Sequence, residues 1–294
     1  MDTNALQNFI DIVSQGSIAE VSRRTNLTPA AINQRIRKLE QEVGLPLLVR
    51  SGHTLMPTKE GLSILNEAKD ILRKIHDLNS VAKSGAIQGQ INVGAFDSAM
   101  TGIIPKVIRS MCAEHPDISF MLTNGYSVNL YRKVFEGELD AAIVIKPIFE
   151  TPKNFEWIKI REEPLIVLSN SAFPEKDAVS LLRKYPLVGY DRNLSGGHLA
   201  VNYLRQIGVQ PRIRCELASV ETIALLVSMG LGVAVVPDWA SSAATPASLV
   251  KIPIKGSFAK SRSIGILWNT QTVRAAAVQK FIDVAQQVCR RHKA

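Results

Sequence analysis

The sequence predicts a multidomain α+β protein with a small N-terminal domain of three helices and a hairpin, a long helix, and two α/β lobes. Three patterns carry this prediction. Apolar residues recur at helical spacing between residues 4 and 43, a heptad repeat covers residues 64–82, and strand-like and helical segments alternate after residue 90. With 294 residues, 46% of them hydrophobic, the chain is long enough to bury several separate cores.

The first three helices are predicted over residues 4–15, 18–25 and 28–43. Ser17 and Thr28 stand at N-cap positions, where a hydroxyl accepts a hydrogen bond from the first helical turn. Pro29 fills the first position of the third helix, where its missing N–H has no cost. Because only Asn26-Leu27 separates the second and third helices, the segment predicts a helix-turn-helix. Two brief apolar segments around residues 51–53 then predict a hairpin wing.

The third helix has a polar face suited to DNA. Its apolar stripe consists of Ile32, Ile36, Leu39 and Val43. The opposite face carries a small residue, three amides and an arginine, namely Ala30, Asn33, Gln34, Gln41 and Arg37. Such groups reach base edges or phosphates, whereas an exposed helix usually mixes glutamate and lysine. Taken alone, the segment also fits an ordinary amphipathic surface helix.

A fourth helix is predicted from Lys59 to about Lys83, with Thr58 as its cap. Its apolar positions alternate at steps of four and three residues and are Ile64, Ala68, Ile71, Ile75, Leu78 and Ala82. A heptad seam of this length predicts pairing with the same helix of a second chain, and packing against its own domain is the alternative. Residues 84–86, Ser-Gly-Ala, predict a flexible boundary.

Residues 90–294 alternate between predicted strands and helices, which indicates two α/β lobes. Residues 139–145, LDAAIVI, form a near-continuous apolar run that is typical of a strand covered on both faces. Other strands are predicted at INVGAF, SFMLT, WIKI, PLIVLS, LVGY, RIRCEL, GVAVVP, LVKIPI and SIGILW. Helices are predicted over residues 101–114, 129–136, 197–206, 220–229 and 273–291.

The formal net charge of +9 favours an anionic partner such as nucleic acid, but its distribution weakens that argument. Residues 1–90 carry eleven basic and nine acidic residues, whereas residues 251–294 carry nine basic and one acidic. The excess therefore lies far along the chain from the third helix. No apolar run reaches eighteen residues and no basic-then-apolar leader occurs, so we expect a cytoplasmic protein without membrane association.

Patterns typical of metal binding and catalysis do not occur. Cys112, Cys215 and Cys289 lie far apart, which fits a reducing compartment and argues against a zinc site, while a redox-sensing cysteine stays an alternative. The five histidines share no spacing, and neither a nucleophile elbow nor a phosphate-binding loop is found. The most enzyme-like stretch, Ser-Gly-Gly-His at residues 195–198, is explained more simply by a Gly-Gly turn before a helix. We expect no enzyme activity, no cofactor and no metal.

Several stretches together resemble the LysR-type transcriptional regulators. They are GSIAEVSRRTNLTPAAINQRIRKLEQEVGLPLLVRSG, TKEG, GQINVGAF, HPDISFMLTNG, FEGELDAAIV and SVETIALLVSMGLGVAVVPDW. They cover essentially the whole chain in the order expected for that family. The resemblance implies a winged helix-turn-helix, a dimerising linker helix, and a two-lobed effector domain like a periplasmic binding protein, assembled as a homodimer or homotetramer. It places the DNA-binding domain at residues 1–58, the linker at 59–86 and the effector domain at 87–294, with lobe I at about 90–161 and 266–294 and lobe II at about 162–265.

The third helix departs from the opening Ser-Gln-Pro-Ala-Leu-Ser-Arg found in many members of this family. Residues 28–34 read Thr-Pro-Ala-Ala-Ile-Asn-Gln, so the proline falls one position early and glutamine replaces arginine. By position, the resemblance implies DNA contacts for Thr28, Asn33, Gln34 and Arg37. The operator sequence does not follow from the resemblance.

The chemistry of the N-terminal residues extends this set of DNA contacts. Basic side chains predicted to reach phosphates are Arg37, Lys38, Arg50 and either Arg23 or Arg24. Asn33 and Gln34 are predicted to read base edges, since an amide can bond adenine bidentately. Pro29 at the opening of the helix and His53 in the wing complete the predicted set.

Residues at strand ends and helix starts in the second half are the predicted effector-binding residues. Open α/β sheets bind ligands at such places, and helix N-termini present free N–H groups to anions. The predicted residues are Ser98, Thr101, Tyr126, Ser127, Lys146, Tyr190, His198 and Ser219. Ser98 and Ser219 resemble cleft-lining positions of the family, and plain helix caps are the alternative. Lys146 or Arg192 would supply the counter-charge for a carboxylate.

The sequence thus predicts a transcription regulator that binds double-stranded promoter DNA and responds to a small-molecule effector, expected to be an anion such as a carboxylate. RNA polymerase is a further candidate partner. Two alternatives stay open. The first, a two-lobed binding protein or enzyme without DNA function, leaves residues 1–61 unexplained. The second is a DNA-binding protein with an empty pocket.

Overall fold

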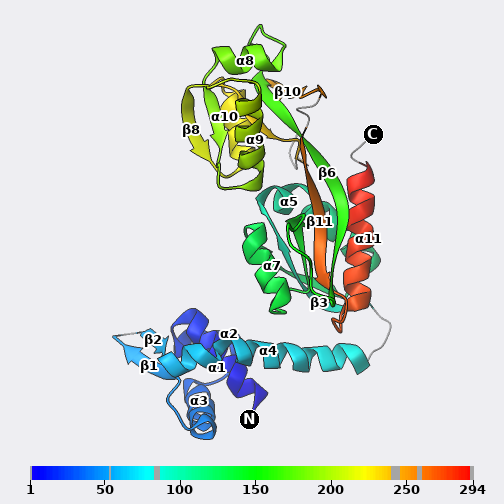
Figure 1. Cartoon of the computed structure of the whole chain (residues 1–294). Coiled ribbons are helices and arrows are strands. Elements are labelled where there is room, and N and C mark those ends of the chain that lie inside the picture. The colour runs from blue at the N-terminus through cyan, green and yellow to red at the C-terminus, as the bar shows by residue number, and fades with distance from the viewer. Residues whose placement is uncertain (1, 53, 83–86, 240–245, 257–259, 292–294) are drawn as a thin grey trace. The chain divides into compact units, whose positions relative to one another are not determined.

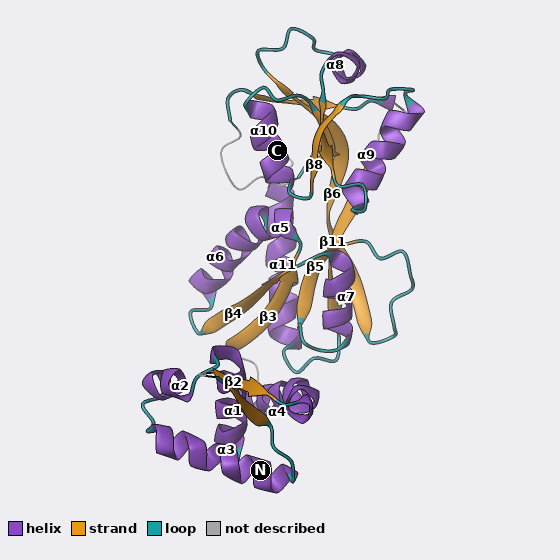
Figure 2. Ribbon diagram, turned by 90° about the vertical axis from the view of Figure 1, so that its left-hand side faces the viewer, coloured by secondary structure: helices purple, strands orange, loops and turns teal. Residues whose placement is uncertain are grey.

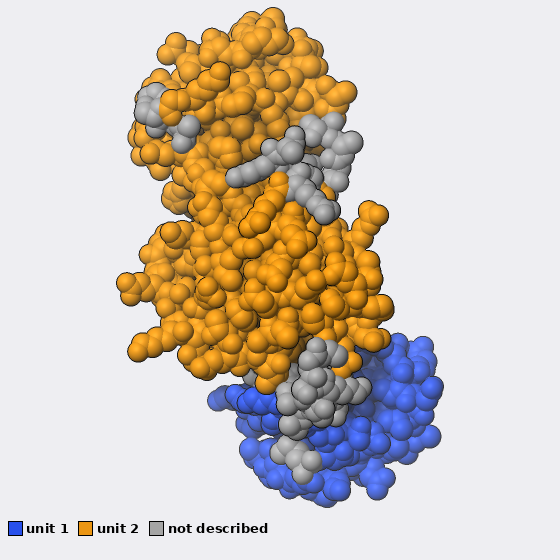
Figure 3. Space-filling model, turned by 90° about the vertical axis from the view of Figure 1, so that its right-hand side faces the viewer, with its two compact units in different colours: residues 1–84 blue, residues 85–294 orange. Residues whose placement is uncertain are grey.

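The computed structural model describes residues 2–52, 54–82, 87–239, 246–256 and 260–291 (Figure 1). The chain forms two compact units, Met1–Ser84 and Gly85–Ala294, which Figure 3 shows in separate colours. Each unit has a hydrophobic core of its own, so the two are structurally separate domains.

Unit 1 begins with three short helices, α1 (Thr3–Gln15), α2 (Ile18–Thr25) and α3 (Pro29–Val43), around one apolar core. Thr28 caps α3 as predicted, because its hydroxyl accepts a hydrogen bond from the N–H of residue 31 at 3.2 Å. Asn26 ends α2 in the left-handed region with φ of 54°, which turns the chain into α3. The predicted helix-turn-helix is therefore confirmed.

The wing follows α3 as the antiparallel pair β1 (Leu48–Ser51) and β2 (Thr54–Pro57). Glu40, near the end of α3, accepts hydrogen bonds from the N–H groups of residues 47 and 48 at 2.8 and 3.2 Å. One carboxylate therefore ties the start of the wing to the helix before it.

The long helix α4 (Lys59–Ala82) agrees with the predicted helix, but the first half of its seam is already buried. Ala68 is 2% exposed in the core of unit 1, and Ile64 packs against the same core. For this half of the seam, the alternative of packing against its own domain applies, because unit 1 itself covers these positions.

The second half of the seam differs from the first. Ile71 is 39% exposed and Ile75 is half-buried, so apolar surface on α4 is open from about residue 71. The side chains of Leu78 and Ala82, and the predicted boundary at residues 84–86, lie outside the described residues.

Lobe I of unit 2 is a sheet with helices on both faces (Figure 2). Its elements are β3 (Gly89–Ala95), α5 (Asp97–Gly102), α6 (Ile104–Glu114), β4 (Ile118–Asn124), α7 (Ser127–Phe135), β5 (Ala141–Ile145), the first part of β6 (Phe155–Asn170), β11 (Ser261–Asn269) and α11 (Ala275–Arg291). The strand order is β4-β3-β5-β11-β6, with β3 parallel to β4 and β5, and β11 antiparallel to both neighbours. α6 and α11 pack on one face and α7 on the other, which explains the apolar run of β5.

Lobe II also has helices on both faces of its strands. Its elements are the second part of β6, α8 (Ala178–Lys184), β7 (Leu187–Tyr190), α9 (Ser195–Gln206), β8 (Ile213–Leu217), α10 (Val220–Ser228), β9 (Ala234–Pro237) and β10 (Leu249–Pro253). β9 and β10 pair with β6, and β7 pairs with β8 and bridges to the segment before β9. α8 and α9 pack into one core and α10 into another.

β6 runs through both lobes as one strand, whereas the sequence predicted two strands at WIKI and PLIVLS. Residues 155–164 pair with β11 in lobe I, and residues 165–170 pair with β9 and β10 in lobe II. Pro164 lies at this change of partners, a position where a strand tolerates a missing N–H. β6 is therefore one continuous strand that takes part in the sheets of both lobes (Figure 1).

Two further elements differ from the sequence prediction. α5 and α6 replace the single helix predicted over residues 101–114, because Pro105 at the start of α6 lacks the N–H that a continuous helix would use. α8 was not predicted, since seven residues are too few to show helical periodicity. Among the described residues, no helix is both long and apolar enough to cross a membrane.

Candidate functional site

The exposed face of α3 and the wing border one groove in unit 1. Its lining residues are Ile18, Ala19, Pro29, Ala30, Asn33, Gln34, Arg37, Lys38, Gln41, Arg50 and Leu55. The charged members of this set, Arg37, Lys38 and Arg50, are all basic and exposed. A groove with basic and amide side chains has the chemistry to contact phosphates and base edges.

Most of the predicted DNA-binding residues meet at this groove. Those that line it are Pro29, Asn33, Gln34, Arg37, Lys38 and Arg50. Thr28 lies beside it as the cap of α3. Arg23 does not line the groove and forms an exposed ion pair with Glu20, which competes with a phosphate contact. His53 lies outside the described residues.

A cavity of about 850 Å³ lies between the two lobes of unit 2, with lining residues from both. The predicted effector-binding residues that line it are Ser98, Tyr126, Ser127, Lys146, Tyr190 and Ser219. This volume is in the range of small-molecule sites. Six residues that were chosen because they lie at strand ends or helix starts therefore line one and the same cavity.

Four helices, α5, α7, α9 and α10, begin at the wall of this cavity. Phe96, Tyr126 and Leu194 are the N-cap residues of the first three, and their side chains make no capping hydrogen bond. Ser219 caps α10 by accepting a hydrogen bond from the N–H of residue 222 at 3.4 Å. The uncapped N–H groups and the partial positive charge at the starts of α7 and α9 favour an anion in the cavity.

A buried cluster of charges adjoins the cavity near Ser98. Ser98 lies at the second position of α5 and is not its cap; its hydroxyl accepts a hydrogen bond from Arg262 Nη2 at 3.2 Å. Arg262, 4% exposed, pairs with Glu163 at 2.7 Å, and Arg161 Nε lies 3.4 Å from the other oxygen of that carboxylate. Two guanidinium groups therefore share one carboxylate in this cluster.

The electrostatic environment of Tyr190 reflects the same cluster. Burial raises the pKa of the Tyr190 hydroxyl, and the nearby charge of Arg262 opposes part of that rise. With a raised pKa the phenol stays protonated at neutral pH, so it can donate a hydrogen bond to a ligand oxygen.

Three predicted effector residues do not line the cavity. Thr101 instead donates a hydrogen bond to Glu221 Oε1 at 2.7 Å, which links α5 of lobe I to α10 of lobe II. His198 is exposed on α9, and the residue of α9 that lines the cavity is Ser195 at its start. Arg192, the alternative counter-charge, makes two side-chain hydrogen bonds to Glu216 at 3.0 Å.

Other residues that line the cavity were not predicted from the sequence. Arg262 stands 164 positions from Ser98, and no sequence spacing connects a residue of β11 with the start of α5. Ile148 and Phe149 follow β5 directly after Lys146, so a wider search past the end of this strand would have found them. Asn193 could have been found in the same way after β7.

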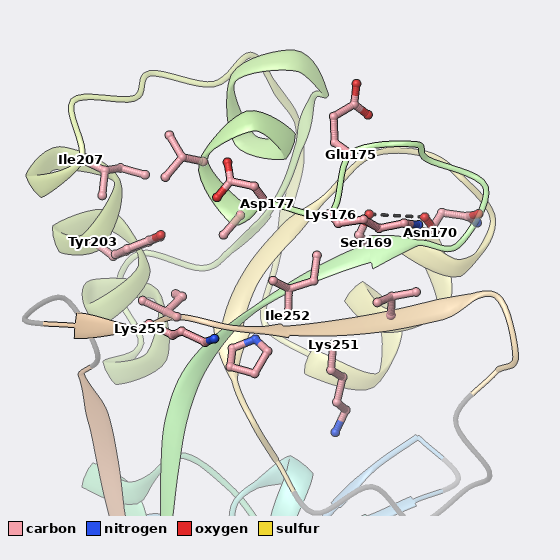
Figure 4. Close-up of a pocket in the computed structure, with 15 residues that line it drawn as sticks. Ser169, Asn170, Glu175, Lys176, Asp177, Tyr203, Ile207, Lys251, Ile252 and Lys255 are labelled. Atoms are coloured by element: carbon pink, nitrogen blue, oxygen red, sulfur yellow. Dashed lines mark hydrogen bonds between the residues drawn. The ribbon is translucent and has the colours of Figure 1, made fainter.

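A second hollow of about 680 Å³ lies inside lobe II among α8, α9 and β10 (Figure 4). Several charged side chains that line this hollow already have partners within the protein. Glu175 pairs with Lys184, and Asp177 caps α8. Lys251 points away from the hollow and pairs with Asp238 at 2.7 Å. The interlobe cavity, with its open helix ends, is therefore the better candidate for an effector. In the described part of the chain, no group of His, Cys, Asp and Glu residues is arranged to hold a metal ion.

Comparison with known proteins finds one family match in each unit of the chain. Residues 3–62 match the "Bacterial regulatory helix-turn-helix protein, lysR family", and residues 84–290 match the "LysR substrate binding domain". The transcriptional regulator CzcR of Bacillus cereus is 26% identical over 239 residues, 81% of each chain. The regulator TtuA of Agrobacterium vitis is 26% identical over 282 residues, 89% of this chain and 92% of TtuA.

Solved structures of similar fold span nearly the whole chain. Full-length CbnR in complex with its target DNA has a TM-score of 0.71 at 18% identity, covering 98% of this chain and 100% of CbnR. A full-length OxyR variant of Pseudomonas aeruginosa has a TM-score of 0.68 at 21% identity, covering 99% and 97% of the two chains.

The chain combines a winged helix-turn-helix with a two-lobed α/β domain. The family matches cover both parts, and this chain belongs to the LysR-type family of transcriptional regulators. It is a DNA-binding transcription regulator with an effector-binding domain.

Proposed function

We propose that this regulator binds promoter DNA through α3 and the wing, and that a small anion in the interlobe cavity modulates that binding. The observation that carries the second part is the convergence of the uncapped N-termini of α7 and α9 on one cavity, with Lys146 at its edge. The proposed DNA-binding domain is residues 1–58, the linker 59–86 and the effector domain 87–294. A homodimer or homotetramer acting in the cytoplasm, with RNA polymerase as a further partner, fits this role.

The lobes offer a physical route for the effector signal. A ligand that touches both walls of the cavity changes the free energy of lobe closure, because it binds one arrangement of the lobes more tightly than another. β6 and the Thr101–Glu221 hydrogen bond connect the lobes, so a movement of one lobe against the other would alter both. In an oligomer, the resulting movement would alter the spacing of the DNA-binding domains.

Phosphate and base contacts in the DNA groove are separable by salt titration. Arg37→Ala should weaken binding to every duplex and lower the slope of log affinity against log salt by about one, since one phosphate contact is lost. Asn33→Ala should leave that slope unchanged and reduce discrimination between cognate and scrambled duplexes by about 1–3 kcal/mol. Fluorescence anisotropy with a duplex from the protein's own upstream region measures both.

Lys69→Ala is the matched control, because Lys69 is an exposed lysine of unit 1 that does not line the groove. A salt slope for Arg37→Ala equal to that of Lys69→Ala would remove Arg37 from the phosphate contacts. Unchanged discrimination in Asn33→Ala would show that this amide reads no base.

The charge of the effector is tested with paired ligands of one shape. Benzoate should raise the melting temperature of the full chain, whereas neutral benzamide should not. Lys146→Gln should weaken benzoate binding roughly threefold to tenfold, since it removes one charge at the edge of the cavity. Lys153→Gln, an exposed residue of the same loop outside the cavity, should have no effect. Equal binding of benzoate and benzamide would contradict an anion site.

A further inference from the structure

We propose that the effector is an amphipathic monoanion whose apolar body packs against exposed apolar side chains of lobe I and whose single charged head lies within reach of Lys146. This inference rests on the proposed function, because it takes the interlobe cavity as the effector site. It names the chemical class that the cavity selects, and it disfavours small hydrophilic di-acids and inorganic anions.

The first observation is a group of exposed apolar side chains at the cavity. Tyr126, Val128, Ile148 and Phe149 are 55%, 73%, 102% and 44% exposed, and all four line this one cavity from lobe I. We call these four residues the apolar rim. Large apolar side chains gathered in one place on a soluble protein mark a surface that something covers, and a concave site of this volume fits a small molecule.

The apolar rim is held in position by aromatic contacts beneath it. Phe149 meets the ring of Tyr131 edge-on, with ring centroids 5.4 Å apart and planes at 86°, and meets Phe135 at 6.1 Å. The Tyr131 hydroxyl donates a hydrogen bond to the carbonyl of Ile145 at 2.5 Å. Ile148 lies next to Phe149, which these ring contacts hold in place. The loop therefore loses little conformational entropy when a ligand covers Ile148.

The second observation is that polar side chains also line the cavity, some of them from lobe II. Asn193, Ser195 and Ser219 line the cavity from that side, at the starts of α9 and α10. A cavity that holds the apolar rim together with polar side chains matches a ligand with one apolar end and one polar end. A ligand that is polar throughout would leave the apolar rim exposed to water.

The charged residues of the cavity favour a single negative charge on the ligand. Arg262 is engaged by Glu163, so the exposed charged side chains that line the cavity are Lys146 and Asp97. Lys146 attracts one carboxylate, whereas Asp97 repels a second. The open helix ends add to the attraction for one anionic head.

A series of carboxylates of increasing apolar size tests this class on the full chain. Acetate, butanoate, hexanoate, benzoate and succinate are titrated at matched ionic strength, with affinity measured by calorimetry. Affinity for the monoacids should rise by about three- to fourfold per buried methylene, with hexanoate and benzoate far above acetate and succinate. Ile148→Ser and Val128→Ser should each weaken hexanoate and benzoate roughly fivefold and leave acetate unchanged. Both side chains are largely exposed, so neither variant removes core packing.

Val273→Ser is the control, because Val273 is 57% exposed outside the cavity and should not affect any ligand. Succinate or acetate binding as tightly as benzoate would overturn the proposal, as would benzoate affinity unchanged in Ile148→Ser. Absence of binding by the whole series also overturns it. So does a change in sedimentation of the ligand-free Ile148→Ser variant, which would show that a second chain covers the apolar rim. Equal affinity for benzoate and benzamide would instead overturn the anion site while leaving the apolar rim supported.

Discussion

Glu163→Gln should lower the free energy of unfolding of unit 2 by about 3–5 kcal/mol, because it leaves the guanidinium of Arg262 buried without a counter-charge. The side chains of Glu163 and Arg262 are each 2% exposed, so water cannot replace the lost partner. Arg161 nearby adds a second positive charge. For a unit of this length the loss corresponds to a fall in melting temperature of about 10 °C.

Tryptophan fluorescence measures this change selectively, since all three tryptophans lie in unit 2. Glu136→Gln, which removes the exposed i,i+4 partner of Arg132, is the control and should change stability by about 0.5 kcal/mol or less. The double variant Glu163→Gln/Arg262→Met should recover much of the loss, because it removes both buried charges. Wild-type stability of Glu163→Gln alone would show that the ion pair does not support the fold.

Gly61→Ala should destabilise unit 1 by about 1–3 kcal/mol and weaken DNA binding, although the same change in an open helix stabilises by about 1 kcal/mol. A Cβ at position 61 would lie 2.2 Å from the carbonyl oxygen of Leu47, so the start of the wing must move away from α4. The wing is bonded to Glu40 of α3, and its displacement therefore disturbs both sides of the DNA groove.

Far-UV circular dichroism and DNA anisotropy follow this effect, while tryptophan fluorescence of unit 2 should not change. Ser63→Ala on the exposed face of α4 is the control, and should raise stability slightly through helix propensity. Increased stability and normal DNA binding in Gly61→Ala would show that the contact with Leu47 yields easily.

The candidate DNA site could be predicted almost entirely from the sequence. Its residues come from one short stretch, so helical periodicity places Asn33, Gln34 and Arg37 on one face, and a cap at Thr28 sets where that face begins. Arg23 stays a prediction; its exposed ion pair with Glu20 depends on a side-chain contact across one turn of α2, which the sequence pattern did not show.

The effector cavity was predictable only in part. Residues at strand ends, such as Tyr126 and Lys146, follow from the rule that parallel strands present their carboxyl ends at one crevice. Arg262 does not follow from it, because its position depends on the antiparallel return of β11 into lobe I. His198 was predicted but does not line the cavity, because the strand-end rule does not show how far along α9 the cavity extends.

By itself, the sequence determined the order of the domains, the apolar and polar faces of α3, and the buried strand β5, since each depends on local spacing of apolar and polar residues. Only the tertiary structure decided which half of the α4 seam is covered, that β6 is one strand shared by both lobes, and that the apolar rim and the starts of α9 and α10 line one cavity. These features join residues far apart in the chain, and their contacts depend on packing and strand register that no local pattern encodes.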